Sequence, residues 1–349
     1  MKKILFIINA LGNGGAQRVV QLLANSLNSA DYSVKVLCIS RIEKEYDHSG
    51  FEIDYLNHNG AHLSKFQRIK AIRKYLKKDK PDVVIAFEYF INMDVIIATR
   101  GLKLKVIVSE RNDPAQQKDR KLVNFLRDYL YRKADALVCQ TPDAKAYFSE
   151  KVQRHAVIIP NPVKSGLPQW SGEDSKKIIN FCRLEKQKNL PLLINAFERI
   201  YAADNGLELY IYGDGKEKES LQKFIDSKGL GKAVHLCAAV NNIHEIAAGC
   251  RLFVSSSDYE GLSNSMLEAM AMGMPTICTD CPCGGARMVI ENNVNGILVP
   301  VGDRDALVAA MRKVISDVGF AAEIAAAAQN ISKKLSQTKI TEKWIEVIR

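Results

Sequence analysis

The sequence predicts an α/β protein of two domains, each a doubly wound parallel β-sheet with helices on both faces. Short apolar runs of the kind that form buried strands alternate with amphipathic segments along the whole chain. A Pro- and Gly-rich segment at residues 161–176 interrupts this alternation once. The length of 349 residues also fits two compact domains of roughly 100–200 residues each.

The first half of the chain alternates strand-like and helix-like segments up to the interruption. Its apolar runs are the strand candidates at residues 4–8, 34–39, 53–56, 83–87, 106–109, 136–139 and 157–159. Its amphipathic segments, in which apolar residues recur with a helical period, lie at residues 16–27, 63–77 and 118–132. Strands separated by helices in this way are typical of a parallel sheet buried on both faces.

The same alternation restarts after the interruption. The strand candidates are residues 178–182, 208–212, 234–236, 252–255, 276–279 and 297–300. The helix candidates between them are residues 190–202, 217–228, 242–249 and 263–272. We therefore divide the chain into domains at residues 1–163 and 164–335, and we expect a C-terminal helix at about 336–349 to pack back on the first domain.

The bulk composition narrows the class of protein. Hydrophobic residues make up 47% and charged residues 25%, as in ordinary globular proteins, and no apolar run approaches the roughly 20 residues of a membrane span. We therefore expect a cytoplasmic protein, with its eight cysteines as free thiols. The net charge of +10 favours an anionic partner, which leaves nucleic acid, an anionic membrane surface and phosphorylated substrates open.

Ligands of open α/β sheets bind beyond the carboxyl ends of the strands, so the loops that follow strands are the places to look for function. The segment GNGGAQR at residues 12–18 follows the first strand and opens a helix, where Gly14 and Gly15 would let the backbone approach an anion. Its spacing is not that of a dinucleotide-binding fingerprint, and a tight packing turn is the alternative.

The segment RLEKQKN at residues 183–189 follows the first strand of the second domain. Its Arg183 and Lys188 suit a leaving diphosphate, although solvated surface cations would look the same in the sequence.

The segment EGLSNSMLEAMAMGMP at residues 260–275 is the most informative one. A helix must begin near Ser263, so the N–H groups of Leu262 and Asn264 would face a phosphate with help from the helix dipole. Glu260 lies ahead of this helix and Glu268 well inside it. The surrounding glycines and apolar residues indicate that both acids face a ligand rather than solvent.

These segments together resemble glycosyltransferase family 4, a family of retaining enzymes with the GT-B fold. The likeness rests on the Glu-x7-Glu pattern, the upstream Arg-x4-Lys pattern and the segment GGAQR, and it continues through NPV at 161–163, GDG at 213–215 and NGILV at 295–299. The resemblance implies two Rossmann-like domains facing a central cleft, the first on the acceptor side and the second binding a nucleotide sugar. It also implies that Arg183 and Lys188 bind the donor diphosphate, that Glu260 holds the sugar hydroxyls and that Glu268 holds the ribose. The remaining donor-binding positions that it implies are Gly14, Gly15, Gly213, Gly261, Leu262, Ser263, Asn264, Gly284 and Gly285.

Within this family the segment SERNDP at residues 109–114 resembles the branch that extends lipid-linked or surface polysaccharides in bacteria. Arg111 stands where many relatives have a histidine. The implied donor is a UDP-hexose or UDP-N-acetylhexosamine. The implied acceptor is a glycan, for which a polyprenyl-diphosphate-linked form is the candidate. The implied chemistry uses Glu260, Arg183 and Lys188 and needs no cofactor.

The three cysteines Cys278, Cys281 and Cys283 have a spacing like that of metal ligands. The sequence has no second pair of ligands to complete a site, so we expect no metal site.

Two basic segments, residues 63–80 and 118–133, allow two interpretations. Each is a helix that packs its apolar face on a sheet and leaves a solvated basic face, or each is also attracted to anionic lipid.

The rival functions are a UDP-sugar epimerase of the same architecture, against which the Glu-x7-Glu pattern argues, and a basic nucleic-acid-binding protein. The latter would need an aromatic platform or a known module, whereas aromatic residues make up only 7% of the chain, so we expect no nucleic-acid partner.

Overall fold

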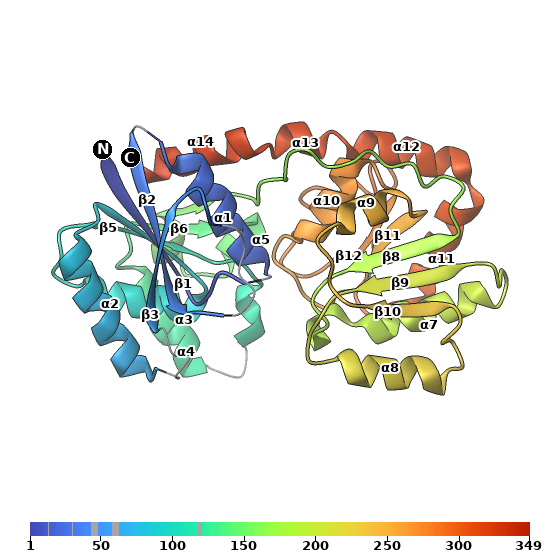
Figure 1. Ribbon diagram of the computed structural model, residues 1–349, viewed down its shortest axis with the longest axis horizontal. Helices are drawn as coiled ribbons and strands as arrows, with labels where there is room; N and C mark the ends of the chain where they lie inside the picture. The colour runs from blue at the N-terminus through green and yellow to red at the C-terminus, as the bar shows by residue number, and fades with distance from the viewer. Residues whose placement is uncertain (13, 30, 43–47, 58–62, 118–120) are drawn as a thin grey trace. The chain divides into compact units, whose positions relative to one another are not determined.

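The computed structural model describes residues 1–12, 14–29, 31–42, 48–57, 63–117 and 121–349. The chain forms two compact units, the first made of Met1–Pro162 with Gln337–Arg349 and the second of Val163–Ser336 (Figure 1). Each unit contains one sheet, and every strand pair in both sheets is parallel. The predicted fold class, two Rossmann-like α/β domains, is confirmed.

The sheet of the first unit has the strand order β3-β2-β1-β4-β5-β6-β7. Its strands are β1 (Lys2–Ile8), β2 (Tyr32–Ser40), β3 (Glu52–Asn57), β4 (Val83–Phe87), β5 (Lys105–Ser109), β6 (Ala136–Cys139) and β7 (Ala156–Ile158). The chain winds outward from β1 in one direction and from β4 in the other. The carboxyl ends of β1 and β4 therefore mark the topological switch point of this unit, where ligands of such sheets bind.

The helices of the first unit cover both faces of this sheet. They are α1 (Gly15–Leu27), α2 (Lys65–Asp79), α3 (Tyr89–Thr99), α4 (Lys121–Tyr131), α5 (Pro142–Ala146), α6 (Glu150–Gln153) and α14 (Gln337–Ile348), with a 3-10 turn, η1, at Pro114–Gln117. In Figure 1, α1 and α14 lie on one face of the sheet, and α2, α3 and α4 lie on the other. The last helix is fastened to this unit by Gln337 Nε2, which donates to Ser26 Oγ at 2.6 Å, and by the fully buried ring of Trp344, which stacks on Phe87.

The sheet of the second unit has the strand order β10-β9-β8-β11-β12-β13. Its strands are β8 (Lys177–Phe181), β9 (Glu208–Tyr212), β10 (Val234–Cys237), β11 (Leu252–Ser255), β12 (Thr276–Thr279) and β13 (Ile297–Val299). Its helices are α7 (Leu190–Tyr201), α8 (Lys218–Ser227), α9 (Ile243–Ala248), α10 (Asn264–Met272), α11 (Arg304–Ser316), α12 (Val318–Ala328) and α13 (Ile331–Lys334), with a 3-10 turn, η2, at Lys186–Lys188. Here β8 and β11 are the neighbours at which the strand order reverses.

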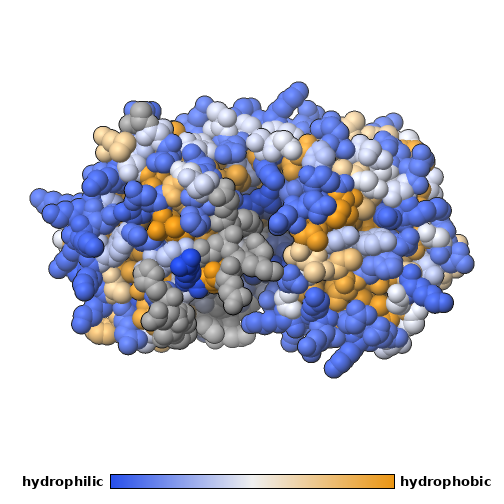
Figure 2. Space-filling model, in the orientation of Figure 1, coloured by the Kyte–Doolittle hydropathy of each residue, from blue (hydrophilic) through white to orange (hydrophobic). Residues whose placement is uncertain are grey.

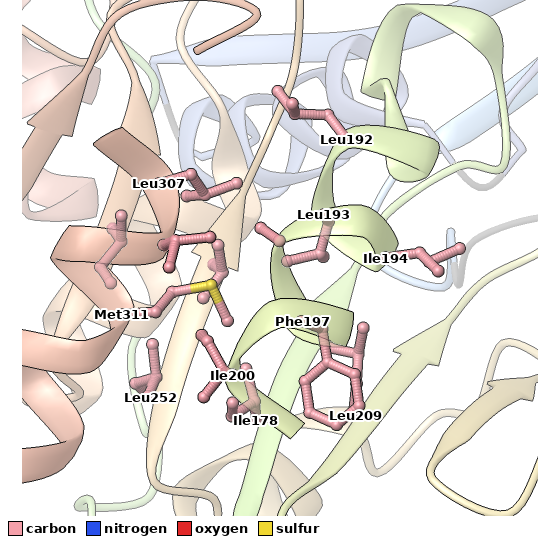
Figure 3. Close-up of a cluster of buried hydrophobic side chains, with 14 of the residues drawn as sticks. Ile178, Leu192, Leu193, Ile194, Phe197, Ile200, Leu209, Leu252, Leu307 and Met311 are labelled. Carbon is pink, nitrogen blue, oxygen red and sulfur yellow. The ribbon is translucent and has the colours of Figure 1, made fainter. Parts of the chain in front are cut away.

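One hydrophobic cluster of the second unit joins α7 and α11 to the sheet. Figure 3 shows Leu193 of α7 pointing toward Leu307 and Met311 of α11, while Phe197 packs beside Leu209 of β9. All five side chains are fully buried, and each such burial is worth about 1.5–3 kcal/mol. Because α7 directly follows η2, this packing fixes the loop that carries Lys188 at the end of β8.

One of the two interpretations of the basic segments, packing of their apolar faces on the sheet, applies only in part. In α2 the side chains of Ile72 and Leu76 are buried, but 77% of the surface of Phe66 is exposed. In α4 the apolar Leu122 and Phe125 are 70% and 66% exposed. In α4 the buried residues are instead Arg127 and Tyr131. Across the described ranges, no helix combines the length and the apolar character needed to cross a membrane.

Candidate active site

The switch point of the second unit brings together two of the predicted segments. The loop after β8 carries Lys188, and the loop after β11 carries Glu260, so two residues 72 positions apart in the chain meet at one sheet edge. Lys188 Nζ forms an ion pair with Glu260 Oε1. Gln187 Nε2 donates to Glu260 Oε2 at 3.1 Å, and Ser257 Oγ donates to Glu260 Oε1 at 3.0 Å. The carboxylate is thus held by one cation and two neutral donors.

This ion pair is largely shielded from water. The side chains of Lys188 and Glu260 are only 13% and 17% exposed. Burial by itself lowers the pKa of Lys188, but the adjacent Glu260 carboxylate outweighs burial and raises the pKa above its ordinary value. Lys188 is therefore a permanent cation at the sheet edge, where a bound anion could share it with Glu260.

The backbone beside Lys188 is pinned to the loop after β11. Asn189 adopts a left-handed conformation with φ 41°, and its Nδ2 donates to Asp258 Oδ1 at 2.7 Å. The Asp258 N–H donates to the Gln187 carbonyl at 2.9 Å, and Ser256 Oγ donates to the carbonyls of Lys188 and Asn189 at 3.0 Å. These bonds preorganise the cation before any ligand arrives, as electrostatic catalysis requires.

Arg183 and Gly213 lie at the same sheet edge but in different environments. Arg183 follows β8 and is exposed, and its guanidinium has no carboxylate partner in the described part of the chain. Gly213 follows β9, and a Cβ at this position would lie 1.9 Å from the Cys182 carbonyl oxygen. Gly213 thus allows the ends of β8 and β9 to approach closely, which is a packing role, while Arg183 is available to a ligand.

The loop that precedes α10 is fitted against a second glycine turn. Ser263 is the N-cap of α10, with its Oγ accepting from the Met266 N–H at 3.5 Å, and Asn264 is the first helical residue. A Cβ at Gly285 would lie 1.7 Å from the Gly261 carbonyl oxygen, so only glycine fits there. Gly284 has φ 75°, a conformation that favours glycine. The predicted positions 261–264 and 284–285 therefore form one packed unit, in which Leu262 is buried.

Glu268 lies inside α10 and is buried, with 4% of its surface exposed. Its Oε2 is 2.8 Å from Nε2 of His244, a buried residue of α9 whose ring meets Phe181 edge-on. This contact orients the Glu268 carboxylate. Sequence reasoning missed His244 because a single histidine on a short helix carries no motif.

A hollow lies beside Glu260, between the ends of β11 and β12 and the beginning of α10. It encloses about 260 Å³, including space open to solvent. It is lined by Ser255, Glu260, Gly261, Ser263, Met266, Cys278, Thr279, Cys281 and Ala286. Burial raises the pKa of the Cys278 thiol and raises that of Cys281 to about 12, so both stay protonated. Among the residues that the structure describes, no three His, Cys, Asp or Glu side chains are grouped to hold a metal ion.

The switch point of the first unit contains a carboxylate that sequence reasoning also missed. Glu88 directly follows β4 and has φ 75°, which is strained for a residue with a side chain. Its Oε1 accepts from Gln17 Nε2 of α1 at 2.9 Å. Gly14 is the N-cap of α1 and Gly15 its first residue, so the glycine segment and Glu88 lie at the same sheet edge. The only signal in the sequence is an acid directly after a buried strand.

Arg111 is used for packing. Its guanidinium lies over the rings of Phe87 and Trp344, at 5.1 and 5.3 Å from their centroids, and Nη1 donates to Asn161 Oδ1 at 3.1 Å. Burial lowers its pKa to about 9. Arg111 therefore helps to hold the C-terminal helix α14 against the ends of β4 and β5.

Two family models together match nearly the whole chain. Residues 13–166 match the family described as Glycosyltransferase Family 4, and residues 169–331 match the family described as Glycosyl transferases group 1. A Campylobacter jejuni enzyme is 29% identical over 100% of this chain and 98% of its own length. It is named GalNAc-alpha-(1->4)-GalNAc-alpha-(1->3)-diNAcBac-PP-undecaprenol alpha-1,4-N-acetyl-D-galactosaminyltransferase. A second Campylobacter jejuni enzyme, an N-acetylgalactosamine-N,N'-diacetylbacillosaminyl-diphospho-undecaprenol 4-alpha-N-acetylgalactosaminyltransferase, is 28% identical over 91% of each chain.

Solved structures of low sequence identity share the fold. HepE of Anabaena in complex with UDP and glucose superimposes with a TM-score of 0.86 at 18% identity, covering 100% of this chain and 99% of that one. TarM of Staphylococcus aureus, in a complex that includes UDP, superimposes with a TM-score of 0.84 at 16% identity over 100% of both chains. The two family matches, which together span nearly the whole chain, and the paired parallel-sheet units show that this protein belongs to the GT4-type glycosyltransferases and is a hexosyltransferase of the GT-B fold.

Proposed function

We propose that this enzyme transfers a sugar from a UDP-hexose or UDP-N-acetylhexosamine to a hydroxyl of a lipid-linked glycan, with retention of the anomeric configuration. The single observation that carries the proposal is the shielded Lys188–Glu260 pair at the switch point of the second unit. The names of the Campylobacter relatives, which specify diphosphoundecaprenol-linked acceptors, and the UDP complexes of the structural neighbours support the choice of substrates.

The donor diphosphate would be bound by cations and by the beginning of α10. Negative charge on the leaving diphosphate grows as the bond to the anomeric carbon breaks, and preorganised cations stabilise that charge. Lys188 is fixed by its backbone contacts, while the exposed Arg183 is free to move onto a phosphate. These two side chains and the α10 dipole would supply the positive charge that other transferases take from a metal ion.

The two acids of the Glu-x7-Glu pattern would hold the sugar and the nucleoside. Glu260 borders the hollow, so its carboxylate would accept from hydroxyls of the donor sugar. Glu268 is oriented by His244 and would accept from the ribose hydroxyls. A carboxylate that accepts from a hydroxyl forms a charge-assisted hydrogen bond, worth about 1.5–3 kcal/mol.

Retention would follow from attack on the face that the diphosphate leaves. The bond from the anomeric carbon to the phosphate oxygen breaks, the acceptor oxygen forms a new bond to that carbon, and the acceptor proton passes to the departing phosphate. The products are UDP and the extended glycan. This route needs no separate base, and positioning supplies much of the rate enhancement. Glu88, at the switch point of the first unit, would orient the acceptor by accepting from one of its hydroxyls.

A lipid-linked acceptor would bring the enzyme to an anionic membrane surface, with the first basic helix contributing attraction. In α2 the side chains of Lys70, Lys74, Lys77 and Lys78 are exposed. Figure 2 shows hydrophilic residues, in blue, along the left edge of the molecule, where the first unit lies. Each basic residue near anionic lipid is worth about 1 kcal/mol. Arg68 belongs to the packed face instead, because it pairs with the buried Asp94 at 2.5 Å. Residues 118–120 of the second basic segment lie outside the described residues.

A donor panel tests the proposed reaction. The purified enzyme is incubated with UDP-, GDP- and ADP-sugars, with and without a polyprenyl-diphosphate-linked glycan, and nucleotide release is measured alongside the masses of the products. We expect acceptor-dependent release of UDP and an acceptor heavier by one sugar. Release from GDP- or ADP-sugars alone would refute the proposed donor, and an isomerised free UDP-sugar would identify an epimerase instead.

The membrane proposal has a separate test. The triple variant Lys74→Ser/Lys77→Ser/Lys78→Ser removes three exposed charges, so about 3 kcal/mol of attraction to anionic vesicles is at stake. Co-sedimentation should weaken with this variant and with added salt, because the Debye length is only about 8 Å at physiological ionic strength. Wild-type protein that ignores anionic vesicles at low salt would contradict this part of the proposal and leave the transfer reaction untouched.

A further inference from the structure

The helix α4 presents a stripe of exposed apolar side chains that the proposed reaction does not use. Leu122 is 70% exposed, Phe125 66%, Leu126 39% and Tyr129 47%. These positions are spaced i, i+3, i+4 and i+7, so they lie on one face of the helix. Single exposed apolar residues are ordinary on protein surfaces, but four on one helical face form a continuous patch that marks a site of interaction.

The stripe cannot turn inward, because the opposite face of α4 is anchored by buried polar contacts. Arg127 is 1% exposed, and its Nη2 donates to the Pro114 carbonyl at 2.9 Å. The hydroxyl of Tyr131, also fully buried, donates to Glu110 Oε1 at 2.5 Å, and Arg127 Nη1 lies 3.8 Å from the same oxygen. Rotating α4 to bury the stripe would break all of these contacts and expose the Glu110 carboxylate without its partners.

The charges around the stripe are positive at both ends. Lys121 precedes it, and Arg132 and Lys133 follow it, all three exposed, with Lys133 Nζ 5.8 Å from the centroid of the Tyr129 ring. The acid on this helix, Asp128, is engaged by Ser149 and Arg132. Burial raises the pKa of Asp128, but these hydrogen bonds outweigh burial and lower it below its ordinary value.

An apolar middle with Phe, Leu and Tyr, bounded by Lys and Arg, is the composition of a helix that lies in the plane of a membrane interface. The long basic side chains can reach the headgroups while the apolar stripe enters the acyl boundary. In Figure 1, α2 lies on the same face of its sheet as α4, and both pack against α3. The exposed lysines of α2 and the 77% exposed Phe66 therefore belong to the same side of the first unit.

We propose that α4 docks the first unit on an anionic membrane by inserting Leu122, Phe125, Leu126 and Tyr129 into the interface. This inference rests on the proposed function for its lipid-linked acceptor, and it adds an apolar, salt-resistant contribution to the electrostatic attraction of α2. Its test uses no catalytic readout, so a failure of sugar transfer and a failure of insertion are distinguishable.

The first experiment compares Leu122→Ser/Phe125→Ser with a matched control, Val294→Ser/Val318→Ser, whose residues are 49% and 54% exposed in the second unit. Flotation with phosphatidylcholine–phosphatidylglycerol vesicles is measured at about 1 M salt, where the Debye length is about 3 Å and lysine attraction is screened. Burying one Leu or Phe side chain is worth about tenfold or more in partitioning, so the α4 variant should bind about 100-fold more weakly than wild type. The control should bind as wild type does, and equal binding by all three proteins would overturn the proposal.

The second experiment measures depth. In Phe125→Trp the new indole should be quenched by vesicle lipids brominated in their acyl chains. The two tryptophans of the wild-type protein, the buried Trp344 and the half-buried Trp170 of the second unit, should not respond. Absence of additional quenching in vesicle-bound Phe125→Trp would overturn the proposal, because electrostatic binding alone leaves the helix outside the acyl region. A concentration-dependent dimer that the Leu122→Ser/Phe125→Ser variant abolishes would also overturn it, by showing that a second copy covers the stripe.

Discussion

The Lys188–Glu260 pair can be dissected by a double-mutant cycle of Lys188→Ala, Glu260→Ala and the double variant. Removing one partner of a fully buried ion pair costs about 3–5 kcal/mol, whereas exposed pairs are worth about 0–1 kcal/mol. The two side chains are 13% and 17% exposed, so this pair lies between those limits. Lys188→Ala leaves Glu260 with its donors from Gln187 and Ser257, which reduces the loss further.

We therefore expect each single variant to lose about 1–3 kcal/mol in the free energy of unfolding. The double variant should lose less than the sum of the two, because it leaves no charge without its partner. In catalysis, Lys188→Ala should lower kcat/KM by about 2–4 kcal/mol of transition-state stabilisation, the range for removing one preorganised donor. Glu260→Ala should lower kcat in particular, and the double variant should again be less than additive.

The assays are denaturant unfolding for stability and initial rates of UDP release for kcat and KM. The matched control is Lys186→Ala, which removes an exposed lysine from the same 3-10 turn and should change neither quantity. Additive losses, each under about 1 kcal/mol, would show that Lys188 and Glu260 act as two solvated charges and would refute the reasoning. An equal loss of activity in Lys186→Ala would refute it as well, because general loop damage would then explain the effect.

Further predictions concern the donor, the acceptor and the fold. Arg183→Ala should cost about 2–4 kcal/mol in kcat/KM without changing the free energy of unfolding, because Arg183 is exposed and holds no carboxylate in the described ranges. Glu268→Ala should raise the donor KM about 10–100-fold through the lost ribose contact, and His244→Ala should raise it less while Glu268 remains. Glu88→Gln should raise the acceptor KM and leave the donor KM unchanged, and a change in the donor KM would remove Glu88 from the acceptor side. The pKa of Asp128 is lowered in the folded protein, so its ionised carboxylate stabilises the fold above the ordinary carboxyl pKa of about 4. This stabilisation is lost as the pH falls through the lower pKa of the folded protein. In thermal unfolding, Asp128→Asn should therefore be destabilising at about pH 7 and nearly neutral at about pH 2.

Most of the fold follows from the alternation of apolar runs and amphipathic segments, because a parallel sheet buried on both faces leaves that pattern in the sequence. The helix α3 does not follow from it. Its residues Ile91–Ile96 are buried on all sides between the sheet, α2 and α4, so the helical period that marks a half-exposed helix is absent. The orientation of α4 does not follow from the periodicity either, since an amphipathic pattern predicts that the apolar face packs and carries no sign of a buried polar anchor. The Glu110–Arg127–Tyr131 contacts make the polar side the buried one.

Motifs identified the main candidates of the site but not their contacts. Lys188 and Glu260 were predicted separately, and their pairing depends on β8 and β11 being neighbours, which is a property of the sheet order. His244 and Glu88 have no motif. They are found only when the structure shows a buried ring beside Glu268 and a strained backbone at the end of β4.

The central claim, that a UDP-sugar donates one sugar to a lipid-linked glycan with retention, is tested most directly by the anomeric configuration of the product. The enzyme is given a UDP-α-sugar and a polyprenyl-diphosphate-linked glycan, and the new linkage is read from the one-bond carbon–proton coupling at its anomeric carbon. We expect an α-linkage, formed in step with UDP release and absent with the Glu260→Ala variant. A β-linkage, or an α-linked product that Glu260→Ala forms at the wild-type rate, would contradict the central claim.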